Sequence, residues 1–320
     1  MKYFNIGEDK VSRLGYGCMR FPIIDGDNAK INEEEATKQL LHAIEKGVNY
    51  IDTAYVYHGD TSESFVGKFV EEHGLRDKLH LVTKLPCWKV ETYEDFEKFM
   101  NEQMANLRTD VIDFYLLHSL DIKTFRKVKD LGVFDFMDKI KKEGKVKHMG
   151  FSFHDEFPAF EEMVKSYDWD FCQIQLNYLD TDYQAGLKGY ELATSLGIPV
   201  VIMEPLKGGR LSNPPKEVLD LNDEFKPLSP SQQALKFPLS LDNVMTVLSG
   251  MNDIKHIDEN IEMASTVDSS SITEADKAFY KKARDIFKSR EQIGCTACEY
   301  CMPCTVSYTH LRAHETLRYL

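Results

Sequence analysis

The sequence predicts an α/β fold, a closed (β/α)8 TIM barrel that is followed by a short C-terminal extension. Eight apolar runs rich in β-branched and aromatic residues recur along the 320-residue chain, and segments with helical spacing lie between them. The runs are continuously apolar rather than alternating, which is typical of parallel strands that are buried on both faces. Eight such strands alternating with helices favour closure into a barrel.

The predicted strands follow one another at regular intervals. They cover residues 12–21, 48–54, 79–85, 111–119, 146–153, 170–177, 199–206 and 244–251. The main alternative is a doubly wound nucleotide-binding sheet, in which the turn GxGxxG follows the first strand. In that place the chain has "GYGCMRFP", which lacks the third glycine. If a dinucleotide binds, we therefore expect the loops of a barrel to hold it.

Three of the connecting segments carry clear helix signals. In the first segment, Asn32 and Glu35 are predicted to form a capping box, and Gly47 is predicted to end the helix. Apolar residues at helical spacing predict the buried faces, which are Leu40, Leu41 and Ile44 in residues 31–47, Phe65, Val66, Phe69 and Val70 in residues 61–74, and Phe96, Phe99, Met100 and Leu107 in residues 92–107. A longer polar connection at residues 206–228 is interpreted as a lid over a ligand.

Composition and charge exclude several classes of function. With 42% hydrophobic and 28% charged residues the chain resembles ordinary globular proteins, and no apolar run approaches the ~20 residues of a membrane span. The N-terminal residues do not resemble a signal peptide, so we expect the protein to be cytoplasmic. The formal charge of −13, without clustered Lys and Arg, argues against binding to nucleic acid or to a membrane. A small molecule is the expected partner.

Polar side chains stand where four predicted strands end. Asp52 follows "VNYI", Lys84 follows "LHLVT", His118 follows "VIDFYLL" and Ser152 follows "VKHMGF". In a parallel barrel these ends point to one mouth, where catalytic groups are found. Tyr57 lies five residues beyond Asp52. We therefore expect an acid, a cation, an imidazole and a phenol to converge at the mouth.

This set of groups suits proton transfer to a carbonyl oxygen. A phenol has a pKa of ~10, and a neighbouring Lys84 ammonium would favour its ionised form, which makes Tyr57 a better proton donor. Asp52 would keep the buried Lys84 charged, and His118 would hold the substrate oxygen. Singly, each residue also has an ordinary structural explanation, such as a turn cap or a solvated charge. The combination in this order is what favours catalysis.

Four motifs resemble those of the aldo-keto reductases, in the order in which that family has them: "NYIDTAYVY", "VTKL", "LRTDVIDFYLLHS" and "GKVKHMGFS". The resemblance covers residues 1–290 and places the catalytic tetrad of the family on Asp52, Tyr57, Lys84 and His118. It implies a TIM barrel enzyme that uses NADPH or NADH to reduce an aldehyde or ketone. A small carbonyl compound is then the substrate.

The same resemblance implies which residues bind the cofactor. Ser152 and Gln173 should hold the nicotinamide carboxamide. The remaining residues implied by the family are Gly17, Cys18 and Met19 in the first predicted strand, Glu204, Leu206, Gly208, Gly209 and Arg210 at the pyrophosphate, and Ser249, Gly250, Met251, His256, Glu259 and Asn260 at the adenosine half. Many members have Asn where this chain has Phe153 and a stacking Tyr where it has Met203. Basic residues for a 2′-phosphate are few, so the choice between NADPH and NADH stays open.

Four cysteines near the C-terminal end have a constant spacing of two intervening residues: Cys295, Cys298, Cys301 and Cys304. Structural zinc sites usually split their ligand pairs across a longer loop, whereas consecutive CxxCxxC is the ferredoxin pattern. A 4Fe-4S cluster is therefore expected. The segment also resembles the ferredoxin-like extension of one aldo-keto reductase subgroup, and we interpret residues 291–304 as a truncated form of it.

Residues 305–320 differ in character from the rest of the chain. Thr305 stands where the subgroup has a proline, and "VSYTHLRAHET" resembles the translation of a sequencing adapter. We interpret this stretch as a non-native tail.

Two functions remain after these observations. The first is carbonyl reduction, in which hydride transfer needs no metal. The alternative is an iron-sulfur electron-transfer or redox-sensing protein that uses the barrel to bind a nicotinamide cofactor. In that case the cluster would imply an electron-transfer partner.

Overall fold

Eight parallel strands close into a barrel in the computed structural model, which describes residues 1–224 and 228–290. In order around the barrel the strands are β3 (Leu14–Gly17), β6 (Tyr50–Asp52), β7 (His80–Leu85), β8 (Ile112–Leu120), β9 (Val146–Phe153), β10 (Phe171–Gln175), β11 (Val200–Met203) and β12 (Val244–Ser249), which pairs again with β3. Every strand predicted from the sequence is present, and the predicted fold is confirmed.

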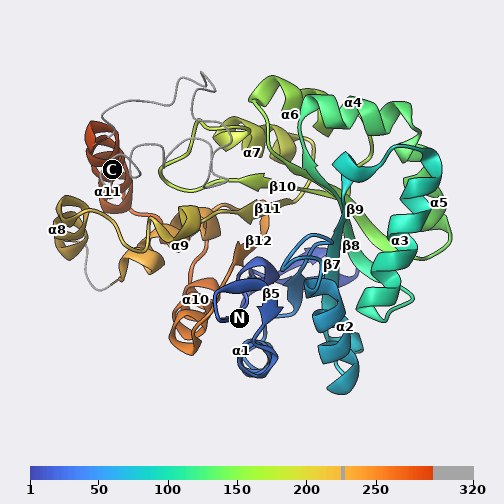
Figure 1. Cartoon of the computed structure of the whole chain (residues 1–320). Helices are drawn as coiled ribbons and strands as arrows, with labels where there is room; N and C mark the ends of the chain where they lie inside the picture. The colour runs from blue at the N-terminus through green and yellow to red at the C-terminus, as the bar shows by residue number, and fades with distance from the viewer. Residues whose placement is uncertain (225–227, 291–320) are drawn as a thin grey trace, which may run out of the picture.

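Helices surround the barrel on the outside (Figure 1). They are α1 (Glu33–Glu45), α2 (Ser62–Glu72), α3 (Tyr93–Leu107), α4 (Ile122–Asp130), α5 (Val133–Lys142), α6 (Phe157–Val164), α7 (Gly186–Ser195), α8 (Lys216–Glu224), α9 (Pro230–Leu239), α10 (Ile254–Thr266) and α11 (Glu274–Arg290). Two short antiparallel hairpins precede α1, formed by β1 (Tyr3–Ile6) with β2 (Asp9–Ser12) and by β4 (Ile23–Ile24) with β5 (Asp27–Ile31). None of the helices in the described residues is long and apolar enough to cross a membrane.

The barrel interior is apolar toward the N-terminal ends of the strands and polar at the mouth, where the strands end. Tyr50, Phe114 and Phe171 pack together inside, and Ile6 and Val11 of the first hairpin join this cluster from the N-terminal side. Side chains two residues apart on a strand point to the same face, so the inward position after Tyr50 is Asp52. In the same way Lys84 follows Val82 and Gln173 follows Phe171. Strand alternation thus carries the polar residues to the top layer.

The connecting helices largely follow the predicted pattern. The four apolar residues predicted for α2 and the four predicted for α3 are all buried. In α1 the predicted Leu40 is buried, and Ala36 and Ala43 are buried with it. Leu41 and Ile44, which were also predicted to be buried, are only partly buried. Gly47 has the left-handed φ of 98° that suits the end of a helix.

The capping box predicted at the start of α1 is half wrong. The Asn32 side chain accepts a hydrogen bond from the Glu35 backbone N–H at 3.2 Å, as predicted. The reciprocal bond is replaced, because the Asn32 backbone N–H donates to the Pro22 carbonyl at 2.8 Å. The Glu35 carboxylate instead accepts from the Gln39 amide at 3.3 Å.

The polar connection at residues 206–228 is partly helical. Its helix α8 packs beside α11 at one end of the molecule (Figure 1), where Val218 and Phe287 belong to one buried cluster. Arg290 also pairs with Glu217 at 2.7 Å. The interpretation of this connection as a lid stays a prediction.

Candidate active site

A buried ion pair stands at the centre of the barrel mouth. The Lys84 Nζ atom of β7 donates to Asp52 Oδ1 of β6 at 2.7 Å and to the Thr53 carbonyl oxygen at 2.7 Å. The Lys84 side chain is fully buried and that of Asp52 is 4% exposed. Because neighbouring parallel strands pair Asp52 with Val82, Lys84 lies one inward position higher and reaches across to the carboxylate. Asp52 Oδ2 has no partner among the described atoms.

Tyr57 and His118 complete the arrangement predicted from the sequence. The Lys84 ammonium lies 5.0 Å from the centre of the Tyr57 ring. The rings of Tyr57 and His118 are 6.1 Å apart and nearly perpendicular, at 78°. The His118 side chain comes from the C-terminal end of β8, and its buried Nδ1 atom has no hydrogen-bond partner among the described residues. All four predicted catalytic side chains therefore meet at one point.

Burial and the ion pair set the protonation states of this group. Burial would lower the pKa of Lys84, but the Asp52 carboxylate and the Tyr57 phenol outweigh it and raise that pKa above its ordinary value. Burial raises the pKa of Asp52, and Lys84 opposes that shift. Burial lowers the pKa of His118 well below its ordinary value, and the Lys84 charge adds to the effect. Lys84 is therefore an ammonium and His118 a neutral imidazole near pH 7.

The expectation for the Tyr57 pKa is only half confirmed. Lys84 lowers the pKa of the phenol as predicted, but burial raises it by more, so the net shift is upward. The phenol is therefore protonated near neutral pH, which is the form a proton donor needs. Sequence reasoning weighed the charge and missed the desolvation, because the burial of Tyr57 depends on neighbours that are distant in sequence.

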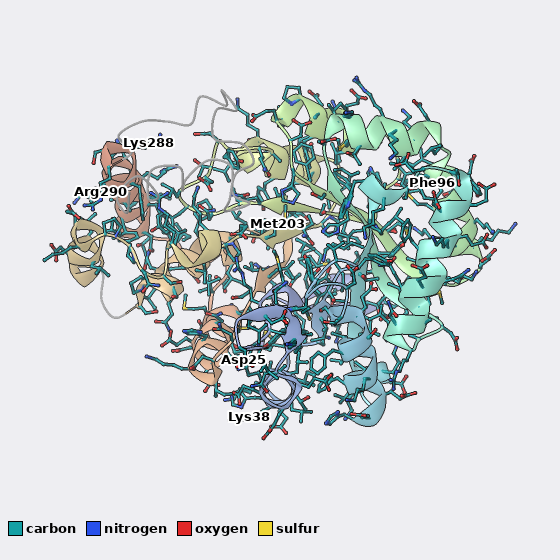
Figure 2. All side chains as sticks on the ribbon, viewed as in Figure 1. Asp25, Lys38, Phe96, Met203, Lys288 and Arg290 are labelled. Atoms are coloured by element: carbon teal, nitrogen blue, oxygen red, sulfur yellow. The ribbon has the colours of Figure 1, made fainter. Side chains whose placement is uncertain are left out.

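Two further polar side chains lie in the same layer as the ion pair. Ser152 is buried and its Oγ atom accepts from the Ser119 backbone N–H at 2.7 Å, so its own proton is available to donate. Gln173 Nε2 donates to the Met203 sulfur at 3.4 Å, whereas Gln173 Oε1 is buried without a partner in the described residues. Met203 ends β11 near the middle of the molecule (Figure 2). A hydroxyl donor and an unsatisfied amide acceptor together fit a planar carboxamide.

The loops after β11 and β12 form the next part of the mouth. Glu204 has a φ of 54°, and its Oε2 atom accepts from the Gly208 N–H at 2.7 Å. Gly208 and Gly209 also have left-handed φ angles, which bring the backbone through a tight turn. The Arg210 guanidinium lies 5.0 Å from the Phe287 ring centre. Leu206 of the same loop is partly buried.

The turn after β12 is fixed by buried contacts. Ser249 Oγ accepts from the Asn260 amide at 3.1 Å, and the Met251 carbonyl accepts from Tyr16 Oη at 2.7 Å. A side chain at Gly250 would meet Arg20, so the turn needs glycine at this point. On α10, Glu259 lies 3.7 Å from Lys255, and His256 is exposed.

The segment after β3 borders the same mouth. Gly17 lies against the Ser249 backbone, and Met19 is 49% exposed. Cys18 is buried, burial raises the pKa of its thiol well above the ordinary value, and its carbonyl oxygen lies 3.1 Å from His58 Nε2. Any contact of Cys18 with a cofactor would therefore use its backbone.

Sequence reasoning missed Trp88, which follows β7 in the short η3 turn (Cys87–Lys89). Its ring centre lies 5.2 Å from that of His118, and 40% of the residue is exposed. The available signal was its place four residues beyond Lys84, in a loop at the mouth. Thr53 was also missed, because its contribution comes from the backbone carbonyl.

The four cysteines predicted to ligate a cluster, Cys295, Cys298, Cys301 and Cys304, lie outside the described residues, as do segments 291–304 and 305–320. Within residues 1–224 and 228–290 there is no group of three or more His, Cys, Asp or Glu side chains that is arranged to hold a metal ion.

The barrel and the proton-transfer group at its mouth define an enzyme of the (β/α)8 class, and comparison with known proteins gives its family. A model described as "Aldo/keto reductase family" matches residues 13–279. The chain therefore belongs to the aldo/keto reductase family. The resemblance to the family is confirmed over residues 13–279, and with it the class of reaction, NAD(P)H-dependent reduction of a carbonyl group.

Individual relatives agree with this placement. An uncharacterized oxidoreductase of Schizosaccharomyces pombe is 26% identical over 279 residues, covering 83% of this chain and 86% of that protein. The holo form of an aldo-keto reductase from Bacillus halodurans is 25% identical, with a TM-score of 0.72 over 88% of this chain and 96% of that one. An aldo-keto reductase from Klebsiella pneumoniae in complex with NADPH shares the fold at 20% identity and a TM-score of 0.68, over 88% of this chain and 94% of that one.

The coupling of Lys84 to Asp52 is testable by a double-mutant cycle. Either Asp52→Asn or Lys84→Met leaves one buried charge unpaired, and each should lower the free energy of unfolding by about 3–5 kcal/mol. The double variant removes both charges, so its loss should be well below the sum of the two single losses. Chemical denaturation of the four proteins measures these values. Strictly additive losses would contradict a coupled pair.

Proposed function

We propose that the protein reduces an aldehyde or ketone to the alcohol, with Tyr57 as proton donor and a reduced nicotinamide as hydride source. The observation that carries this proposal is the buried Lys84 ammonium, which is held by Asp52 at 2.7 Å and lies 5.0 Å from the Tyr57 ring centre. When a carbonyl oxygen gains negative charge, a phenol beside an ammonium can release its proton to it.

His118 orients the carbonyl oxygen in this proposal. A neutral imidazole offers one N–H donor, and the lowered pKa of His118 keeps it in that form through the neutral range. A charged imidazolium would repel the Lys84 ammonium and would compete with Tyr57 as the proton donor. Because the rings of His118 and Tyr57 are nearly perpendicular, both can approach the same oxygen from different sides.

The cofactor residues are proposed from the resemblance to the aldo-keto reductases and, for Ser152 and Gln173, from their contacts at the mouth. NADPH or NADH would supply the hydride when bound. The Ser152 hydroxyl and the unpartnered Gln173 Oε1 would hold its carboxamide. Gly17, Cys18 and Met19 would border the nicotinamide side, the loop Glu204 to Arg210 the pyrophosphate, and Ser249, Gly250, Met251, His256, Glu259 and Asn260 the adenosine half. The Klebsiella relative in complex with NADPH supports the phosphorylated form.

Exchange of Tyr57 for Phe tests the proton donor. Tyr57→Phe should lower kcat by about 10²–10⁴-fold, because no other phenol faces Lys84 in the described residues. NADPH binding, measured by fluorescence titration, should stay nearly unchanged. Turnover is measured with a panel of small aldehydes and ketones and with both cofactors.

A matched control is available two residues away. Tyr55 is partly buried and donates to Glu102 at 3.1 Å, away from the ion pair. Tyr55→Phe should therefore retain turnover. If Tyr57→Phe turns over substrate as fast as Tyr55→Phe, the assignment of the proton donor is wrong.

We further propose three segments: residues 1–290 as the aldo-keto reductase barrel, residues 291–304 as a truncated ferredoxin-like segment, and residues 305–320 as a non-native tail. The constant spacing of Cys295, Cys298, Cys301 and Cys304 supports a 4Fe-4S cluster on the second segment. Cys18, Cys87 and Cys172 are free thiols, which suits a reducing compartment such as the cytoplasm.

Iron analysis of anaerobically purified protein tests the cluster. We expect about four irons and four labile sulfides per chain, and their loss when the four cysteines are changed to serine. Bound zinc without iron would contradict the proposal. Cluster reduction by NADPH in the absence of any carbonyl compound would favour the alternative, an iron-sulfur electron-transfer or redox-sensing protein with an electron-transfer partner.

A further inference from the structure

Outside the barrel wall, directly behind Lys84, polar side chains join β7 to helices α2 and α3. We call this group the Glu63 network; it consists of Glu63 of α2, Thr83 of β7, Gln103 and Asn106 of α3, and Tyr115 of β8. Glu63 is 1% exposed, and Thr83, Gln103 and Tyr115 are fully buried. Side chains in this position normally form an apolar seam between sheet and helices. A buried carboxylate there is therefore unusual.

The network contacts the backbone of Lys84, not its side chain. Strand β6 ends at Asp52, and the last backbone bond on this side runs from the Thr53 N–H to the Val82 carbonyl at 2.9 Å. The Lys84 carbonyl lies two residues beyond Val82 on β7 and points to the same side of the strand. At that height β6 has already ended. The Gln103 amide donates to that oxygen at 3.0 Å. A side chain of α3 thus replaces the missing strand at the residue that carries the ammonium.

Gln103 is itself held from both ends of its amide group. Its Oε1 atom accepts from Tyr115 Oη at 2.7 Å. Its Nε2 atom donates to Glu63 Oε1 at 2.7 Å and lies 3.1 Å from Thr83 Oγ1. The side chain therefore has one orientation, and it defines the position of the Lys84 carbonyl.

Glu63 anchors the network through its carboxyl group. Its carboxylate accepts from Thr83 Oγ1 at 2.5 Å, from Gln103, and from the Asn106 amide at 3.3 Å, and it has no ion-pair partner in the described residues. Burial raises the pKa of Glu63, and the Lys84 charge opposes that shift. Tyr115 and Tyr55 are further titratable groups within its electrostatic reach. The hydrogen-bond donors to Glu63 are neutral groups, so a charged carboxylate in this position costs stability. We interpret this cost as a sign that Glu63 serves the function of Lys84.

We propose that Glu63 and Gln103 are positioning residues for Lys84. Gln103 fixes the lysine backbone at the open end of β7, and Glu63 fixes Gln103 while adding a second negative charge behind the ammonium. The inference rests on the role of Lys84 in the proposed function.

Steady-state kinetics of Gln103→Leu and Glu63→Gln over a range of pH tests this proposal. Gln103→Leu should lower kcat about tenfold with little change in the KM for NADPH, because a displaced ammonium no longer faces Tyr57. Glu63→Gln should move the basic limb of kcat/KM to lower pH, since removal of a negative charge lowers the pKa of both Lys84 and Tyr57. Thr83→Val and Thr83→Ser repeat the test with smaller changes. Only the serine variant keeps the hydroxyl that donates to Glu63, so only the valine variant should show the kinetic effect.

The control is a buried hydrogen bond of similar kind far from the mouth. Tyr280 Oη of α11 donates to the Gln233 carbonyl at 3.1 Å, and Tyr280→Phe should alter stability but neither kcat nor the pH profile. If the network variants behave like Tyr280→Phe, the network is merely structural and the inference is wrong. Lys84→Met separates a failure of the proposed function from a failure of this inference. If Lys84→Met is active, the proposed function itself is wrong. If Lys84→Met is inactive and the network variants are unaffected, only the role of Glu63 and Gln103 is wrong.

Discussion

The site depends on keeping one buried ammonium charged inside the barrel mouth. Lys84 is fully buried, and burial alone would lower the pKa of its ammonium group. The Asp52 carboxylate at 2.7 Å and the Thr53 carbonyl at 2.7 Å replace the lost hydration. Burial lowers the pKa of His118 and raises that of Tyr57, and the Lys84 charge adds to the first shift and opposes the second. Burial and this one ion pair together set the protonation states of the other groups.

The barrel supplies the geometry that this electrostatic arrangement needs. Parallel strands end at one mouth, and their alternation puts an apolar layer around Tyr50 and Phe114 beneath the polar one. This buried apolar layer lowers the local dielectric constant, so each charge acts over several ångströms. The strands differ in length, however, and β6 ends before β7. At that step the Gln103 side chain of α3 donates to the Lys84 carbonyl, and Glu63 of α2 accepts from Gln103.

Much of this could be predicted from the sequence, because strand position and burial follow from local pattern. Continuous apolar runs located all the barrel strands, and polar residues at their ends located Asp52, Lys84 and His118. The half-formed cap at Asn32 was missed because its competitor, the Pro22 carbonyl, comes from a preceding hairpin. The upward shift of the Tyr57 pKa, the Trp88 contact and the Glu63 network were missed for the same reason. Each depends on which distant segments pack together, and no local spacing encodes that.

The protonation state of Lys84 is the most direct test of the whole account. Nitrogen-15 NMR of the lysine side chain, assigned by comparison with Lys84→Met, follows its titration in the intact protein. The account predicts that Lys84 stays protonated through neutral pH and titrates above the ordinary lysine value of about 10.4. A Lys84 side chain that loses its proton near neutrality would contradict it, because neither Asp52 nor Tyr57 would then face a charge.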